Sequence, residues 1–394
     1  MKQLKMTRLL SSLLLSGVLL AGCGWFNDPD MDTEDPDMEE ETPSDENGSA
    51  VPEDAEGDPG EETDPEDETE DDDQAEVDQD LTVWFPKFED TLMDYEGEGN
   101  EFAPFTRYPQ FVKDESIQIV ESTGGTDVVT IYEYSENEVR EVFIRPETYF
   151  REDFADTGLE SEQEDFEIIL QLPLEEGHSW ESPSGSTSEI TGVAVDKALP
   201  SGNVTALEVT RTSENGSETV EYYAEDIGLV ERVFRTEEGE NIISSTLNTR
   251  AENTPEEFPL TVYSVDDQAM GLERTSVTME LYTNEPARLA MAEILRGQAP
   301  DTETARVIVD STEINFMYLR QDGVVHADFS VDLADMNAGS GVEALILQGI
   351  VNTIGSYYNV EDVLLTLDNE PYESGHIALE EGETLSVDYS NINE

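Results

Sequence analysis

Cysteine and histidine are the residue types found most often in reactive and metal-binding sites, and this chain of 394 residues contains one cysteine and three histidines. The histidines His178, His326 and His376 stand far apart in the sequence. A structural zinc site needs about four nitrogen or sulfur ligands held together, so we predict no metal site and no cofactor. A single cysteine also excludes an internal disulfide and a cysteine-based redox pair.

Motifs for covalent catalysis or phosphate binding are missing as well. No GxSxG elbow, Walker loop or dinucleotide fingerprint precedes a helix-like segment. A glycosidase needs two carboxylates about 5 to 10 Å apart, but with 94 acidic residues in the chain no pair can be singled out. We therefore predict no catalytic residue, and an extracytoplasmic hydrolase is the least favoured function.

The one cysteine stands where it could receive a lipid. The chain begins MKQLKMTRLLSSLLLSGVLLAGC, with three basic residues before an apolar run from Leu9 to Leu20 and small residues before Cys23. This order is typical of a secretory signal peptide. The apolar run is shorter than the roughly 20 residues that a membrane-spanning helix needs, so we expect no permanent transmembrane anchor.

The residues Leu20, Ala21, Gly22 and Cys23 resemble the bacterial lipobox. The resemblance implies a diacylglycerol, with fatty-acyl chains such as palmitate, on the thiol of Cys23, and cleavage that makes Cys23 the mature N-terminus. The alternative is a plain signal peptide followed by a chance cysteine. We expect residues 1–22 to be removed and the protein to be lipid-anchored on the extracytoplasmic face of the cell membrane.

Charge and composition define the next segment. Residues 23–80 are rich in Asp, Glu, Pro, Thr, Gly and Ser, contain no lysine or arginine, and predict an acidic disordered tether because they can bury little apolar surface. The whole chain has a formal net charge of −75, which repels nucleic acid and fits a salty or alkaline exterior. Calcium binding is an alternative, but no DxDxDG loop with a closing glutamate is present.

Residues 81–253 consist of short runs of alternating polarity separated by Gly and Asn turns, a pattern typical of antiparallel hairpins. We expect Val204–Thr212 to pair with Thr219–Ala224 across an Asn-Gly turn, and Leu229–Phe234 to pair with Asn241–Leu247. Aromatic residues of this domain could line a ligand groove, although core positions are favoured; they are Trp84, Phe85, Tyr95, Phe102, Tyr108 and Trp180.

Residues 254–394 mix strands with two amphipathic helices. The segment PARLAMAEILRG predicts a helix with Asn284 as its N-cap, and SGVEALILQGIVNTIG predicts a second helix opened by a capping box of Ser340 and Glu343. The predicted strands are Leu260–Val265, Ile314–Leu319, Val324–Phe329 and Val360–Leu367. Such elements fit a two-layer α/β sandwich with the helices on one face of the sheet.

This C-terminal stretch resembles the GerMN domain of bacterial sporulation and spore-germination proteins. The resemblance rests on PARLAMAEILRG, VVHADFSVDL with the DFS element Asp328, Phe329 and Ser330, GVEALILQGIVNTI and VEDVLLTLDNEP. It implies an α/β fold akin to the ring-building motif, used for protein interaction and not for catalysis. The germination protein has two GerMN copies, whereas one is recognisable here. Residues 81–253 look like the β-rich portion of envelope lipoproteins from spore-forming Gram-positive bacteria.

The predicted fold class is therefore α+β, with a β-rich antiparallel domain followed by a two-layer α/β GerMN-like domain. The leading functional hypothesis is a lipid-anchored, non-catalytic envelope protein. Its GerMN-like domain would bind an unidentified protein during sporulation, germination or wall maintenance. The alternative is an extracellular module that binds cell-wall glycan or a small ligand through the β-rich domain.

Overall fold

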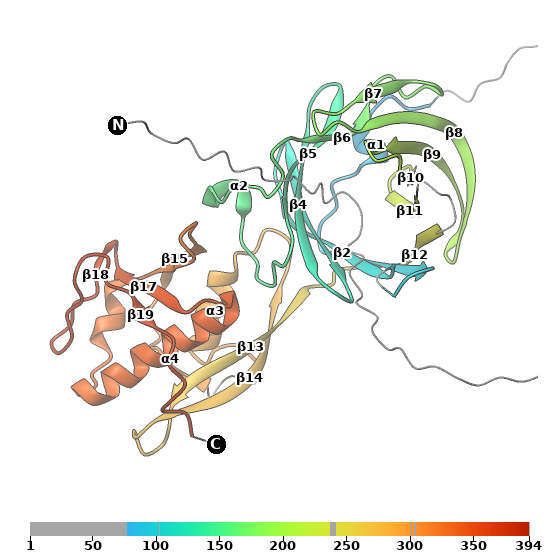
Figure 1. Ribbon diagram of the computed structural model, residues 1–394. Helices are drawn as coiled ribbons and strands as arrows, with labels where there is room; N and C mark the ends of the chain where they lie inside the picture. The colour runs from blue at the N-terminus through green and yellow to red at the C-terminus, as the bar shows by residue number, and fades with distance from the viewer. Residues whose placement is uncertain (1–76, 102, 237–241, 301, 303–304, 394) are drawn as a thin grey trace, which may run out of the picture. The chain divides into compact units, whose positions relative to one another are not determined.

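The computed structural model describes residues 77–101, 103–236, 242–300, 302 and 305–393 (Figure 1). The lipobox residues Leu20, Ala21, Gly22 and Cys23, the signal peptide and nearly all of the tether lie outside the described residues. Within the described residues, no helix is both long and apolar enough to cross a membrane.

A single antiparallel sheet of 12 strands makes up the first part of the described chain. Its order is β6-β5-β4-β3-β2-β1-β12-β11-β10-β9-β8-β7, and Figure 1 shows that it is strongly curved. The prediction of a β-rich antiparallel region is confirmed. The elements are α1 (Leu81–Trp84), β1 (Thr91–Glu98), β2 (Phe105–Val112), β3 (Ser116–Thr123), β4 (Asp127–Tyr134), β5 (Glu138–Arg145), α2 (Phe154–Thr157), β6 (Glu167–Gln171), β7 (Ser179–Glu181), β8 (Thr187–Leu199), β9 (Gly202–Thr212), β10 (Glu218–Ala224), β11 (Gly228–Arg235) and β12 (Ile242–Glu252).

Local turn chemistry explains the hairpins that the sequence predicts. Strand β9 pairs with β10 from Thr212 and Glu218 onward, and Gly216 adopts the left-handed conformation (φ 81°) in the turn between them. Strand β11 pairs with β12 as expected. Both predicted strand pairings are confirmed; the turn between β11 and β12 lies outside the described residues.

Side chains join the two end strands of this sheet. The indole Nε1 of Trp180 in β7 donates to the carbonyl oxygen of Ile168 in β6 at 3.0 Å. The backbone N–H of Ile168 donates to Oγ of Ser182 at 2.9 Å. An edge strand normally leaves such backbone groups unpaired, so these two bonds satisfy part of the edge of β6.

The second part of the described chain has two smaller sheets and two longer helices. Strands β13 and β14 form an antiparallel pair, and the five-stranded sheet runs β15-β16-β17-β18, with β19 also paired to β17. Strand β16 is parallel to β17, and helix α4 lies between them in sequence. The elements are β13 (Glu256–Val265), β14 (Leu272–Leu281), α3 (Ala287–Leu295), β15 (Ile314–Leu319), β16 (Val325–Phe329), the 3-10 helix η2 (Val331–Asp335), α4 (Ser340–Tyr358), β17 (Asp362–Leu367), β18 (Glu370–Pro371) and β19 (Leu385–Ser386).

Helix α4 packs against β13, β16 and β17. Its residues Leu347, Ile350 and Ile354 are buried. The inward residues of the sheet are buried as well, among them Val325, Ala327, Phe329, Val363 and Leu365. The helical spacing of apolar residues in α4 and the period of two in the strands together form this core.

Two predicted helix caps are wrong. Helix α3 begins at Ala287 with Pro286 at the N-cap, and Oδ1 of Asn284 instead accepts the N–H of Val112 in β2 at 2.8 Å. Glu343 makes no capping box, because its buried carboxylate accepts the hydroxyl of Tyr372 at 2.9 Å. Tertiary partners outcompete the local bonds that the sequence suggested.

The apolar core is continuous between the two parts. Strand β12 ends at Glu252 and β13 begins at Glu256. One hydrophobic cluster nevertheless contains Tyr108 and Phe143 from the curved sheet together with Leu319 and many other residues of the second part. The two parts of the described chain therefore share buried surface and do not meet only through a connecting strand.

Replacing Gly349 with alanine should test the packing of α4 on β13. A Cβ at this position would lie 2.4 Å from the carbonyl oxygen of Tyr263, so the helix must shift, and we expect the free energy of unfolding in urea to fall by about 1 to 3 kcal/mol. Gly341→Ala in the same helix is the control, because its Cβ would meet no heavy atom within 4 Å. Equal stability of the two variants would contradict the close packing described above.

Candidate functional site

The face of the five-stranded sheet that points away from α4 carries three half-buried rings, Phe316, Tyr318 and His326. We call these residues the aromatic face. The ring centroids of Phe316 and His326 are 4.9 Å apart in an edge-on contact, and those of Phe316 and Tyr318 are 5.6 Å apart. Alternation along β15 places Met317 and Leu319 inward and Phe316 and Tyr318 outward.

Hydrogen bonds fix the ring of His326. Its Nδ1 lies 3.3 Å from the hydroxyl of Tyr318, and its Nε2 lies 3.3 Å from Oγ1 of Thr366. Burial, assisted by nearby Arg320, lowers the pKa of His326. The ring is therefore uncharged at neutral pH, and the aromatic face presents polarisable, neutral surface in an acidic chain.

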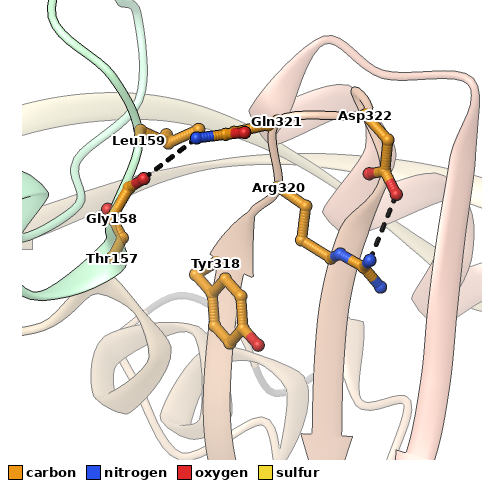
Figure 2. Close-up of a pocket in the computed structure, with 7 residues that line it drawn as sticks. All are labelled: Thr157, Gly158, Leu159, Tyr318, Arg320, Gln321 and Asp322. Carbon is orange, nitrogen blue, oxygen red and sulfur yellow. Dashed lines mark hydrogen bonds and ion pairs between the residues drawn. The ribbon is translucent and has the colours of Figure 1, made fainter.

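A shallow pocket of about 460 Å³ continues from Tyr318 toward the turn after α2 (Figure 2). We call it the junction pocket, because its walls come from both parts of the described chain. The amide Nε2 of Gln321 donates to the carbonyl oxygen of Gly158 at 3.2 Å, and Nη2 of Arg320 lies 3.3 Å from Oδ2 of Asp322. The pocket is lined by Thr157, Gly158, Leu159, Tyr318, Arg320, Gln321 and Asp322.

The chemistry of this surface suits binding. An aromatic ring, a guanidinium group, a carboxylate and an amide stand together at one edge of the sheet, as Figure 2 shows. Tyr and Arg side chains are enriched at protein interfaces because they combine apolar contact area with hydrogen bonding. The aromatic face and the junction pocket together form our candidate functional site.

The DFS element has a structural role in this fold. The carboxylate of Asp328 is fully buried and accepts hydrogen bonds from Oγ1 of Thr366, the N–H of Asn369 at 2.7 Å and Nδ2 of Asn315 at 2.8 Å. Asn369 has a positive φ of 70° in the turn between β17 and β18. Asp328 therefore holds that turn and the neighbouring strands together.

Inside the curved sheet, a group of ion pairs connects neighbouring strands and also strands that are far apart in the sheet order. Nε of Arg232 lies 2.9 Å from Oε1 of Glu221, and Nη2 of Arg211 lies 3.3 Å from Oε2 of the same carboxylate. Arg232 also binds Glu121 at 2.8 Å, and Arg211 lies 3.4 Å from Glu167. Strands β11 and β3 are separated by three strands in the sheet order, so the Arg232–Glu121 contact crosses the interior of the curved sheet.

The carboxylates of this interior group differ in how well they are paired. Burial alone would raise the pKa of Glu221, but the two guanidinium groups of Arg211 and Arg232 lower it to about 2. Burial raises the pKa of Glu141 to about 7, although Arg211 opposes the shift. Nε of Arg107, a residue only 4% exposed, lies 3.8 Å from Oε2 of Glu121, an ion pair without a hydrogen bond.

Glu221→Gln should show what this pairing contributes. The substitution leaves Arg211 and Arg232 without their shared anion, and removing one partner of a buried pair costs about 3 to 5 kcal/mol, so we expect a loss near the lower value at pH 7. The folded-state pKa lies below the ordinary value of 4.5. The stabilisation is therefore present above about pH 4.5 and is lost as the pH falls toward 2.

Chemical unfolding between about pH 2 and pH 7 measures this difference, which should shrink as the pH falls. Glu218→Gln is the matched control, because the side chains of Glu218 and Arg235 are each 44% exposed and their charged atoms are 3.9 Å apart; a change within about 0.5 kcal/mol is expected. If both variants lose the same free energy of unfolding at pH 7, Glu221 is not stabilised by Arg211 and Arg232 as described.

The aromatic and histidine residues singled out in the sequence do not come together in one site. Five of the six aromatic residues considered for a groove, Trp84, Phe85, Tyr95, Tyr108 and Trp180, are buried, as the core interpretation predicts, and Phe102 lies outside the described residues. His178 packs beside Trp180, and His376 is exposed in a loop. Within the described residues, His, Asp and Glu form no group of three or more able to hold a metal ion.

Sequence reasoning missed the candidate site and the interior ion pairs. Phe316, Tyr318 and His326 recur with a period of two across a hairpin and could have indicated one outward face. Arg107, Arg211 and Arg232 stand within strand-like runs of a chain that has few cations, a signal that they pair with carboxylates in the fold.

Comparison with protein families places the C-terminal part of the chain. Residues 261–373 match the family model Germane, described as "Sporulation and spore germination". The predicted resemblance to the GerMN domain is therefore confirmed for this segment. No curated protein matches the chain.

Three solved structures are similar to parts of the chain. The first GerMN domain of the sporulation protein GerM from Bacillus subtilis is 21% identical, with a TM-score of 0.26, covering 32% of this chain and 96% of that one. The tandem GerMN domains of the same protein are 20% identical, with a TM-score of 0.22, covering 34% and 45%. A protein with a YmcC-like fold from Bacteroides fragilis is 10% identical, with a TM-score of 0.26, covering 43% and 99%.

Proposed function

We propose that this protein is a lipid-anchored, non-catalytic protein of the cell envelope whose GerMN domain binds another protein during sporulation, germination or wall maintenance. The match of residues 261–373 to a sporulation and spore-germination family carries the proposal. The helices α3 and α4 and the five-stranded sheet would form the two-layer arrangement expected of such a domain. The burial of the inward side chains of β15, β16 and β17 supports this arrangement.

The aromatic face and the junction pocket are the surface we assign to the partner. Partly exposed aromatic side chains rimmed by polar groups are common at protein interaction sites. A second copy of this chain is a poor occupant, because two chains that each carry a formal net charge of −75 repel one another. The partner that complements this charge presents basic residues around an apolar centre.

Anchoring through Cys23 determines where this binding takes place. We expect the wild-type protein to sediment with membranes and its N-terminal peptide to carry a thioether-linked lipid, because a diacyl anchor holds a protein at a bilayer. Cys23→Ala should release the protein from the membrane fraction. Mass spectrometry and cell fractionation measure both outcomes. An unmodified thiol in the wild type, or a Cys23→Ala protein that stays in the membrane, would contradict the anchor.

A photo-crosslinking residue in place of Tyr318 should identify the partner. Because the ring of Tyr318 stands at the edge of the junction pocket, we expect a discrete adduct in living cells that weakens at high salt. The same residue at Glu176, which is exposed in the β-rich part, is the control. If position 176 gives the same adducts, or position 318 gives none in sporulating and vegetative cells, the assigned surface is wrong.

The alternative function, glycan or small-ligand binding by the β-rich part, has less support. It depends on aromatic residues lining a groove, and five of the six considered are buried. Cosedimentation of the protein with purified wall material separates the two functions. Binding that survives Phe316→Ala and Tyr318→Ala would favour a wall-binding function outside the aromatic face.

A further inference from the structure

Glu152 lies at the junction between the two parts of the described chain. It precedes α2 and is only 5% exposed. Its Oε1 accepts the backbone N–H of Leu319 in β15 at 2.9 Å, a bond that joins the two parts. Its Oε2 is buried and has no hydrogen-bond partner among the described residues. Leu319 is flanked by Tyr318 and Arg320, so the bond holds the strand that forms one wall of the junction pocket.

The surroundings of this carboxyl group favour its neutral form. Burial raises the pKa of Glu152 to about 8, and the N–H of Leu319 and the charge of Arg145 in β5 offset only part of this shift. Asp153, the next residue, disfavours a second negative charge.

Among the described residues, the other neighbours of Glu152 supply no further cation. From β3, Nε2 of Gln118 donates to the backbone oxygen of Glu152 at 2.7 Å and not to its carboxylate. From α4, the hydroxyl of Tyr358 donates to Met317, and that of Tyr357 accepts the N–H of Arg151. Arg151 itself is engaged with Glu256. An ionised Glu152 would therefore be a buried charge with one unsolvated oxygen, which is far more costly than a neutral carboxyl group.

We propose that the junction between the curved sheet and the GerMN part is closed while Glu152 carries a proton and opens when Glu152 ionises. Opening hydrates the carboxylate and breaks its bond to Leu319, so β15 and the wall of the junction pocket become mobile. The protein thereby responds to the pH outside the cell at the surface that we assign to the partner. The inference rests on the junction itself and holds whether or not that partner is found.

The direction of the pH effect follows from proton binding. In the open state the carboxyl group is solvated and has an ordinary pKa, whereas in the closed state its pKa is raised to about 8. The closed state therefore binds more protons between the two values and is progressively disfavoured as the pH rises through this range. Each further pH unit up to about 8 shifts the closed-to-open equilibrium by about tenfold toward the open state.

Hydrogen exchange of the full chain at about pH 6 and pH 8, with rates corrected for intrinsic exchange, tests the proposal. In the wild type we expect the protection of β15, including the Leu319 amide, to fall by about tenfold or more at the higher pH. Glu152→Gln keeps an oxygen acceptor and cannot ionise, so its protection should change by less than about threefold. Glu164→Gln, at an exposed position in the following loop, should behave as the wild type.

A second variant, Arg145→Gln, tests the proposal even if Glu152→Gln does not fold. Arg145 stabilises the ionised form of Glu152 in the closed state, so Arg145→Gln should raise the closed-state pKa further. In this variant the protection of β15 should keep falling with pH above about 8, where in the wild type it levels off. Protection of β15 that does not change with pH in the wild type would overturn the proposal. So would an equal loss of protection in the wild type and in a folded Glu152→Gln protein, or a loss that levels off at the same pH in Arg145→Gln as in the wild type.

Discussion

The guanidinium group of Arg151 is the contact on which the geometry of the candidate site depends. Its side chain is fully buried and donates to the carbonyl oxygens of Gln110 in β2, Leu281 in β14 and Tyr282 after β14, while Glu256 lies 3.4 Å away. One charged group therefore satisfies acceptors on both parts of the described chain. Because a buried cation is tolerated only when such acceptors surround it, the two parts cannot separate without exposing it. Opening at Glu152 therefore frees β15 and one wall of the junction pocket without separating the two parts at Arg151.

Buried carboxylates in this protein behave differently according to the number of cations they face. Glu221 lies between two guanidinium groups, which lower its pKa to about 2 against the effect of burial. Glu256 faces Arg151, yet burial raises its pKa to about 7, and Glu152 has no cation in direct contact and a pKa of about 8. The stabilisation at Glu221 is consequently lost in acid, whereas burial opposes the ionisation of Glu141 in the curved sheet and of Glu256 and Glu152 at the junction. The chain has 94 acidic and 19 basic residues, and the pairing of its buried carboxylates is incomplete at both places.

The sequence predicted features that depend on residues close together in the chain. It missed hydrogen bonds whose partners lie far apart in the chain. The hairpin of β9 and β10 and the helix α4 follow from turn residues and apolar periodicity within about 20 residues. Asn284, Glu343 and Arg151 were missed because their partners are remote: Val112, Tyr372 and Tyr282. A polar residue next to a helix start matches a local capping pattern in the sequence. Whether it caps the helix or bonds to a more distant group depends on the tertiary fold. The candidate site depends on such choices, so its outline could not be read from the chain alone.

The family match covers residues 261–373, but the surface that we assign to the partner extends beyond them. Thr157, Gly158 and Leu159 form one wall of the junction pocket, and Glu152 supports the strand that forms the other. A GerMN domain separated from the curved sheet would lose that wall and expose apolar residues that pack against Tyr108 and Phe143. Binding properties of isolated GerMN domains therefore do not transfer directly to this protein. Its β-rich part completes the site and, through Glu152, sets the pH range in which the site is held in one conformation.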